Sequence, residues 1–384
     1  MSAFRKVFLL VINIIVGVLP NFAAATSRPF HLNGLVKVPR TNTPDDHYKN
    51  AILLSPTFSY AKETSATFGL FTLYQFKPKK AGHLTRPSNI IGSGWASLMG
   101  QFTIGSRHEI LTTGEKIYLH GQFNYRQFPE YFFGVGASTT PENKMTLSSK
   151  AFQLEEQIYF KIANRLFIGP QLRFFRYYDL SLTDASAGYH LTDFYGTANQ
   201  NNIGLGLGIL CDHRDLIMTP SHGYYIAGTV TFHQPLWGSD FNFVKLTFDG
   251  RKFFDFQTAG KSVLALQFKT ELNLGDVPLT ELSQLGGEMS MRGYMLGRYR
   301  DRNSFQSQIE FRQHLVWRIG LTAFAGAGTV APQPSNLVRL NNIKTAAGVG
   351  FRFNINRQDP ANLRIDYGMT EEGGGIYISF GEAF

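Results

Sequence analysis

Strict alternation of apolar and polar residues is the feature that most constrains how this chain folds. In residues 116–126 the odd-numbered positions hold Ile, Leu, Gly, Phe and Tyr, while the even-numbered positions hold Lys, Tyr, His, Gln, Asn and Arg. The same two-residue period recurs in 244–251, 264–274 and 308–315. Successive side chains of a β-strand point to opposite faces, so each segment predicts a strand with one apolar and one polar face. The polar faces carry mixed charges, which suits either a solvated outer surface or a water-filled lumen.

Sixteen segments of this kind predict an all-β protein, a 16-stranded antiparallel transmembrane β-barrel that forms one domain over residues 50–384. The expected strands are 50–61, 64–77, 91–106, 114–127, 131–139, 149–163, 165–179, 201–214, 222–235, 240–255, 261–275, 303–315, 317–330, 343–356, 361–370 and 374–384. The mean hydropathy of -0.13 agrees with a barrel, because the two faces of each strand average to a neutral value. The 34 Phe, 17 Tyr and 38 Gly suit aromatic girdles and a tightly curved sheet.

The N-terminal residues have a different character from the rest of the chain. An apolar run over 7–19 follows two basic residues and precedes three alanines at 23–25. This order predicts a cleaved secretory signal peptide at 1–25. A retained membrane helix is the alternative, but the run is shorter than the roughly 20 residues that span a bilayer. We expect residues 26–49 to form a short periplasmic segment ahead of the barrel.

The chain ends on an aromatic residue that continues the register of the last expected strand. That register holds Ile376, Ile378, Phe380 and Phe384. Such a strand predicts an insertion signal, which the outer-membrane assembly machinery would capture by strand pairing while this protein itself is inserted. An ordinary edge strand that happens to end in Phe is the alternative.

Charge and motifs argue against nucleic-acid binding and catalysis. The formal net charge of +9 is scattered along the chain, which favours a polar lumen or loops that face lipopolysaccharide. The ten histidines show no metal-binding spacing, and Cys211 is a lone cysteine that we expect to be inert. Ser221 and His222 are neighbours, and we expect neighbouring strand residues to point to opposite faces. We therefore expect no nucleic acid, enzyme activity, cofactor or metal.

A long connection lies between the eleventh and twelfth expected strands and reads LGGEMSMRGYMLGRYRDRN over 285–303. It resembles the sixth extracellular loop of the bacterial surface antigen family, the superfamily of the BamA and TamA outer-membrane assembly factors. In that family an Arg-Gly-Tyr or Arg-Gly-Phe tripeptide at the loop tip folds back into the barrel lumen. The residues that match the loop motif are Arg292, Gly293, Tyr294, Gly297, Arg298 and Asp301. The segments 212–225 and 363–368 also resemble strand signatures of the family.

Two features depart from the family pattern. The resemblance implies an aspartate on the thirteenth strand as the partner of the loop arginine, but Gly326 stands at that position. A buried guanidinium needs acceptors, so we expect Glu310 or Asp366 to pair with Arg292 instead. Family members that assemble or translocate proteins carry periplasmic POTRA domains, and residues 26–49 are too short for one. We therefore expect a barrel-only member.

The resemblance implies a protein of the bacterial outer membrane that inserts or translocates proteins or lipids. Its working parts would be a lumen-plugging Arg-Gly-Tyr loop and a weakly closed seam between the first and last strands. The implied partners are outer-membrane lipid, lipopolysaccharide, client outer-membrane proteins and periplasmic accessory proteins. A passive pore for small solutes is the main alternative, and an adhesive surface protein is a third. The client or solute and the oligomeric state stay open at this point.

Overall fold

Antiparallel β-strands are the main secondary structure of the described chain. The computed structural model describes residues 50–78, 85–183, 188–217, 219–256, 261–356 and 361–384. The expected signal peptide at 1–25 and the expected periplasmic segment at 26–49 lie outside these residues. Within the described ranges, no helix is long and apolar enough to cross a membrane.

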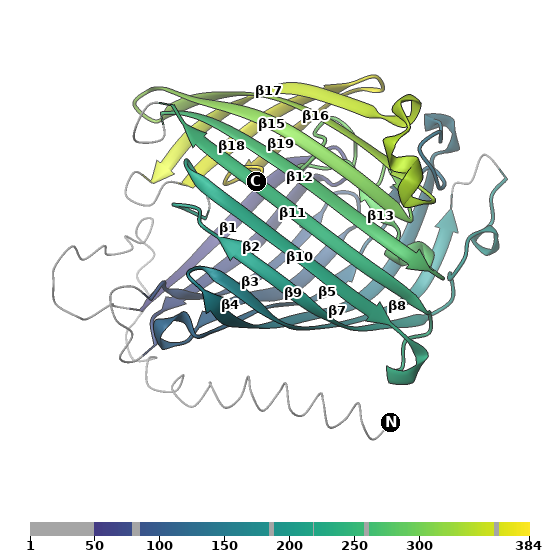
Figure 1. Ribbon diagram of the computed structural model, residues 1–384. Coiled ribbons are helices and arrows are strands. Elements are labelled where there is room, and N and C mark those ends of the chain that lie inside the picture. The colour runs from purple at the N-terminus through teal and green to yellow at the C-terminus, as the bar shows by residue number, and fades with distance from the viewer. Residues whose placement is uncertain (1–49, 79–84, 184–187, 218, 257–260, 357–360) are drawn as a thin grey trace. The chain divides into compact units, whose positions relative to one another are not determined.

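Sixteen long strands of the described residues form the wall of a closed barrel (Figure 1). They are β1 (Ala51–Ala61), β2 (Ser65–Phe76), β3 (Ser88–Ser97), β4 (Phe102–Leu111), β5 (Ile117–Gln127), β7 (Met145–Ala163), β8 (Leu166–Thr183), β9 (Gln200–Asp212), β10 (Gly223–His233), β11 (Phe243–Asp255), β12 (Ser262–Gly275), β15 (Asn303–Val316), β16 (Ile319–Ala331), β17 (Lys344–Asn356), β18 (Ala361–Thr370) and β19 (Gly373–Phe380). Each strand pairs antiparallel with the next one along the wall, and β19 returns to pair with β1. The predicted all-β, 16-stranded antiparallel barrel is confirmed.

Short elements lie in the connections. The three short strands are β6 (Glu130–Phe132), β13 (Ser283–Leu285) and β14 (Tyr299–Asp301). The 3-10 turns are η2 (Thr113–Glu115), η3 (Pro141–Asn143), η4 (Leu191–Asp193), η5 (Pro235–Trp237), η6 (Leu279–Glu281), η7 (Pro334–Val338) and η8 (Leu340–Asn342). β13 pairs with β14 inside the connection 276–302, which we call the long loop.

The two ends of the barrel differ. We call the end where β1 begins and β19 ends the terminal end, and the opposite end, from which the long loop departs, the loop end. Turns at the terminal end include the short connections 164–165 and 317–318. Short turns of this kind are typical of the periplasmic side of bacterial barrels, whereas longer loops face outward.

Alternation along each strand separates an apolar outer face from a polar inner face. Phe123 on β5 is 37% exposed on the outside. Its neighbour Gln122 faces inward, where Nε2 donates to Glu155 Oε2 at 2.8 Å. Elsewhere in the interior, Gln308 Nε2 donates to Gln267 Oε1 at 2.6 Å. Polar side chains of the interior therefore bond to one another across strands, and the apolar outer face suits a lipid environment.

Two of the expected strands are wrong, although their number is right. The range 91–106 is divided into β3 and β4 by a hairpin turn in which Gly100 has a φ of 77°. The range 131–139 contains no strand of the wall, because Gly134 and Gly136 interrupt it with φ values of 95° and 115°. These left-handed backbone conformations break strand pairing. The two errors cancel in the count.

The end of the chain also differs from the expected strand. β19 ends at Phe380, and Ile376, Ile378 and Phe380 share its outer register, with Ile376 and Phe380 48% and 46% exposed. The last four residues turn inward, so Phe384 is 4% exposed and packs in a cluster with Phe253 of β11. The prediction that Phe384 continues the outer register is therefore wrong. Burial of its ring inside the wall removes apolar surface from water.

Candidate functional site

Two glycines let the backbone of the long loop approach other residues closely. Gly293 has a φ of 116°, and a Cβ there would lie 2.6 Å from Thr370 Cγ2 on β18. Gly297 has a φ of 75°, and a Cβ there would clash with the guanidinium of Arg300. Asp301 in β14 is buried, and its Oδ1 accepts a hydrogen bond from the next backbone N–H at 2.7 Å. Burial raises the pKa of the Asp301 carboxyl. The loop tip therefore lies against the inner face of β18.

Arg292 lies at this tip, and its side chain is fully buried. One guanidinium nitrogen donates to Asp366 Oδ2 at 2.5 Å, and the other donates to Glu310 Oε2. The guanidinium carbon also lies 3.5 Å from the ring centroid of Phe324 on β16. The side chains of Glu310 on β15 and Asp366 on β18 are 0% exposed. The structure thus brings both expected carboxylates to the same arginine.

Gly326 explains why neither carboxylate comes from β16. A Cβ at Gly326 would lie 3.1 Å from the sulfur of Met291, so the residue before Arg292 occupies the space beside this glycine. Met291 itself is 1% exposed. Because Met291 and Phe324 occupy the inner face of β16, the acceptors for the guanidinium of Arg292 come from β15 and β18.

The last strand of the barrel contacts the loop tip directly. The backbone N–H of Gly293 donates to Tyr377 Oη at 3.0 Å, and Tyr377 Oη donates to the carbonyl of Tyr294 at 3.1 Å. Tyr377 lies on β19 and is 0% exposed. Tyr294 packs against Tyr299, with their ring centroids 5.7 Å apart. The position of the tip is therefore linked to β19 by hydrogen bonds.

Two further arginines of the long loop bind residues near the loop end. Arg298 Nε donates to Glu372 Oε2 at 2.6 Å, and its Nη1 donates to Thr139 Oγ1 at 3.0 Å. Arg300 Nη1 donates to Glu130 Oε1 at 3.0 Å. Both arginines are 2% exposed. Three arginines therefore attach one loop to two strands of the wall, to β6 and to two connections at the loop end.

The partners of Arg292 are themselves shared with arginines of the wall. Glu310 accepts from Arg312 Nε at 2.7 Å, and Asp366 accepts from Arg352 Nη1 at 2.5 Å. A second guanidinium adds attraction and hydrogen bonds, which offset more of the desolvation cost of a buried carboxylate than one partner does. The tip of the long loop is thus one part of a larger ionic cluster.

This cluster extends to the C-terminal residues. Arg352 Nε donates to Glu382 Oε2 at 2.8 Å, and Arg312 Nη2 donates to the carbonyl of Phe384 at 3.0 Å. Sequence reasoning missed Arg312, Arg352 and Glu382. The available clue for Arg312 was its place two residues from Glu310, because residues two apart on a strand share a face.

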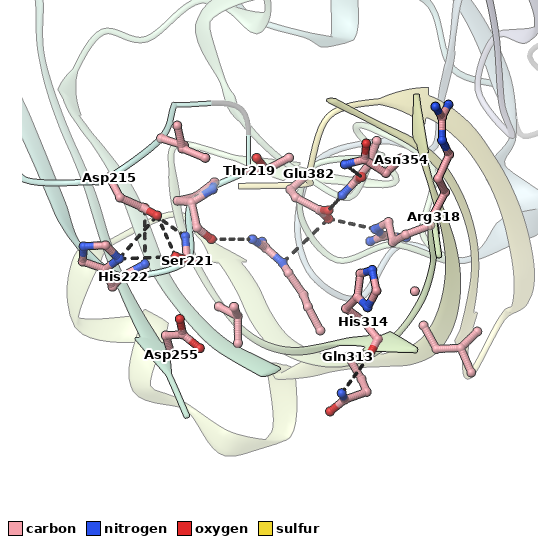
Figure 2. A pocket seen from close by; sticks show the side chains of 18 residues that line it. Asp215, Thr219, Ser221, His222, Asp255, Gln313, His314, Arg318, Asn354 and Glu382 are labelled. Carbon is pink, nitrogen blue, oxygen red and sulfur yellow. Dashed lines mark hydrogen bonds and ion pairs between the residues drawn. The ribbon is translucent and has the colours of Figure 1, made fainter. Parts of the chain in front are cut away.

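A cavity of about 670 Å³ opens beside these C-terminal residues at the terminal end (Figure 2). Arg312, Arg352 and Glu382 line it together with residues of the connection between β9 and β10. The carboxylate of Glu382 also accepts from Asn362 Nδ2 at 2.6 Å. The inward-turned C-terminus therefore forms part of the cavity wall.

Ser221 and His222 line the same cavity and do not behave as expected. Ser221 Oγ donates to Asp215 Oδ2 at 2.6 Å, and His222 Nδ1 lies 3.3 Å from that Oγ (Figure 2). The expectation that the two side chains point apart is wrong, because both residues precede β10 and lie in a turn. The serine bonds directly to the aspartate, whereas in a Ser-His-Asp relay the histidine lies between them.

The first and last strands meet at a sparse seam. Within the described residues one pairing, Tyr60 opposite Ile378, joins β1 to β19. By contrast, β19 pairs with β18 along its whole length, and β1 pairs with β2 along its whole length. Elsewhere along the seam, the described residues of β1 and β19 present strand edges with no assigned partner, and such edges are templates for pairing with another strand.

Comparison with known proteins agrees with this geometry. The model of the Omp85 superfamily domain matches residues 114–384. The fold is similar to BamA from Haemophilus ducreyi lacking POTRA domains 1-3, with a TM-score of 0.59, 12% identity, and coverage of 89% of this chain and 74% of that chain. It is also similar to CdiB from Acinetobacter baumannii, with a TM-score of 0.55, 13% identity, and coverage of 86% and 59%. CdiB from Escherichia coli gives a TM-score of 0.55, 10% identity, and coverage of 85% and 62%.

The chain spans less than two thirds of the two CdiB chains. None of the curated proteins matches it in sequence. At identities of 10–13% the structural likeness establishes the fold, and the family match over most of the barrel establishes the relationship. The resemblance to the BamA and TamA superfamily is confirmed, and with it a place in the bacterial outer membrane. The chain belongs to the Omp85 superfamily.

Proposed function

We propose that this protein inserts or translocates outer-membrane proteins, with the seam between β1 and β19 as the place where a client strand pairs. The sparse pairing of this seam is the observation that carries the proposal. A client strand that adds to an exposed edge gains backbone hydrogen bonds over its whole length. Opening a seam with one assigned pairing disrupts far less than opening any of the fully paired neighbours.

In this proposal the long loop plugs the lumen, and the position of its tip depends on whether the seam is closed. Its tip binds Tyr377 on β19 through two hydrogen bonds, and Arg292 binds Asp366 on β18. A movement of β19 away from β1 therefore strains the tip, and release of the tip removes support from β19. The cluster of Arg312 and Arg352 adds the C-terminal residues to the same coupled unit.

The proposed partners follow from this mechanism. Client outer-membrane proteins would arrive at the terminal end, where periplasmic accessory proteins would deliver them. Outer-membrane lipid and lipopolysaccharide would surround the apolar wall. Lipid is the alternative cargo that would pass through the same seam. The outer-membrane assembly machinery would insert this barrel itself.

A reversible crosslink across the seam tests the proposal. Tyr60→Cys and Ile378→Cys place two thiols on directly paired residues, in a Cys211→Ser background that removes the native thiol. Directly opposite residues have Cβ atoms about 4.5–5.5 Å apart, so a modest adjustment allows a disulfide. The matched control, Phe58→Cys with Phe68→Cys, joins β1 to β2, which are already paired.

The readout is the rate at which an unfolded outer-membrane protein folds into proteoliposomes that contain each variant. We expect oxidation to abolish the acceleration in the seam variant, reduction to restore it, and neither treatment to affect the control. Equal acceleration by the oxidised and reduced seam variant would show that the seam does not open during function.

A further inference from the structure

Two ionisable residues lie on the outer face of the barrel, among residues that otherwise face lipid. His108 on β4 and Glu156 on β7 form a close pair, with 3.2 Å between Nε2 and Oε2, which is an ion pair when His108 is protonated. Their side chains are 18% and 16% exposed. Both belong to the outer register, because the pairing places them in one row with Gly121 on the intervening strand β5. The inward-facing neighbour of Glu156, Glu155, instead pairs with Arg173 inside the barrel.

Gly121 makes this pair possible. A Cβ at Gly121 would clash with the carboxylate of Glu156, so the glutamate side chain lies across the surface of the glycine to reach His108. Any larger residue at this position would separate the two charges. The pair thus occupies a notch that three adjacent strands create together.

The notch lies near the middle of the apolar band. On β7, Leu154 and Phe152 continue the outer register on one side of Glu156, and Ile158 and Phe160 continue it on the other side. The row of paired residues through Glu156 runs from Ile52 at the terminal end of β1 to Leu274 at the loop end of β12. β7 is the sixth of the eleven strands in that row, so Glu156 is equally far from both margins.

Small and polar residues continue the notch toward β2. The adjoining row holds Thr72, Gly92 and Ser106, all in the outer register, and Thr72 Oγ1 donates to the carbonyl of Gly92 at 3.3 Å. We call His108, Glu156, Gly121 and these three residues the polar patch. Its members are smaller or more polar than the Phe, Leu and Ile that neighbouring parts of the outer face carry.

Lipid alone is a poor neighbour for the polar patch. Acyl chains at mid-depth offer no hydrogen-bonding groups, so the mutual pairing of His108 and Glu156 offsets only part of the cost of holding two ionisable side chains there. Lys252 is another charged residue of the outer register, but it lies three residues from the end of β11, where its long side chain reaches the interface. Glu156 lies seven residues from the nearer end of β7, so its shorter side chain has no such route, and no described residue donates to its Oε1.

We propose that the polar patch is the contact surface for a second copy of this chain in the membrane. The patch is self-complementary, because it presents one donor and one acceptor on either side of Gly121. Because barrel strands tilt by about 35–45°, the row through the pair is inclined to the membrane plane. A two-fold axis along the membrane normal through this glycine brings His108 of each copy within side-chain reach of Glu156 of the other, with an offset of about 6 Å in depth. The small residues Thr72, Gly92 and Ser106 on one side of the pair let the two walls approach closely there, as small residues do at membrane-embedded helix interfaces.

Disulfide trapping tests this surface with a matched control. Ser106→Cys places a thiol in the polar patch, and Ser307→Cys places one on the outer face of β15, away from it. Both are made in the full chain with Cys211→Ser and reconstituted into phospholipid vesicles. We expect oxidation to give covalent dimers with Ser106→Cys and only monomers with Ser307→Cys.

Adding His108→Leu and Glu156→Leu to Ser106→Cys is expected to abolish the dimer, whereas Lys252→Leu leaves it intact. Native mass spectrometry should show a dimer peak for the unmodified chain. The variant with His108→Leu and Glu156→Leu should show no dimer peak. Monomers in every variant would overturn the proposal. Dimers that persist without His108 and Glu156, or crosslinks from Ser106→Cys in cells that join a different protein instead of a second copy, would also overturn it.

Discussion

Removal of the Arg292 charge is the most direct test of how the long loop is held. Arg292→Met keeps an unbranched side chain but leaves Glu310 and Asp366 without their shared partner. Breaking a buried ion pair costs about 3–5 kcal/mol. We take about 3 kcal/mol for the seated loop, because Arg312 and Arg352 still neutralise the two carboxylates. That value lowers the ratio of seated to released loop about a hundredfold, since each 1.4 kcal/mol is tenfold.

Trypsin cleavage of the long loop measures this ratio. Arg298 and Arg300 are 2% exposed while the loop is seated, so cleavage after them requires release. When opening and closing are fast, the cleavage rate follows the population of the open form. We expect cleavage after these residues to rise by about two orders of magnitude in Arg292→Met. Single-channel recording should show large openings in the variant where the parent shows small ones.

The matched control is Arg302→Met, because this arginine belongs to the same loop but its side chain is exposed. It should leave both the conductance and the cleavage after Arg298 and Arg300 unchanged. If Arg292→Met behaves like Arg302→Met, the ionic cluster does not hold the loop. A large, stable, ion-selective conductance in the parent protein would instead favour the passive pore.

Three further changes test other parts of the structure. Gly293→Ala should release the loop as Arg292→Met does, because its Cβ would meet Thr370 at 2.6 Å, and the same recordings check it. Burial raises the pKa of Glu63, in the turn after β1, from 4.5 to about 7, so the folded state binds the extra proton between these values. The free energy of unfolding should therefore fall as pH rises from 4.5 to about 7, and urea titrations of Glu63→Gln should lack that fall. Phe384→Ala should lower the free energy of unfolding in detergent by about 3 kcal/mol, and an unchanged urea midpoint would contradict the burial of this ring.

Local patterns account for the parts of the fold that sequence reasoning predicted correctly. A two-residue period needs no tertiary information, so the strand class, the two faces and the membrane-spanning barrel follow from it. The same approach failed between β3 and β4, because alternation continues through the turn at Gly100 and nothing in the period marks the hairpin. It also failed at Gly134, where alternation suggested a long strand but pairing ends after the short strand β6, at the left-handed glycines.

The loop motif was equally readable from the sequence, and so was the need of Arg292 for a carboxylate. Which carboxylate it meets depends on closure of the barrel, because Asp366 lies 74 residues further along the chain. In the structure both candidate carboxylates, Glu310 and Asp366, bind Arg292. The ring of Phe324 also packs on its guanidinium, a contact that no spacing in the sequence indicates.

What the sequence determined by itself is therefore the strand pattern, the family and the place in the outer membrane, since each rests on residues that are neighbours along the chain. Only the tertiary structure decided that Phe384 turns inward, that β1 and β19 pair once, and that His108 meets Glu156 across a glycine. These features depend on register between strands that are distant in sequence. Register is fixed by how all the faces of the barrel pack and close together, which no single segment contains.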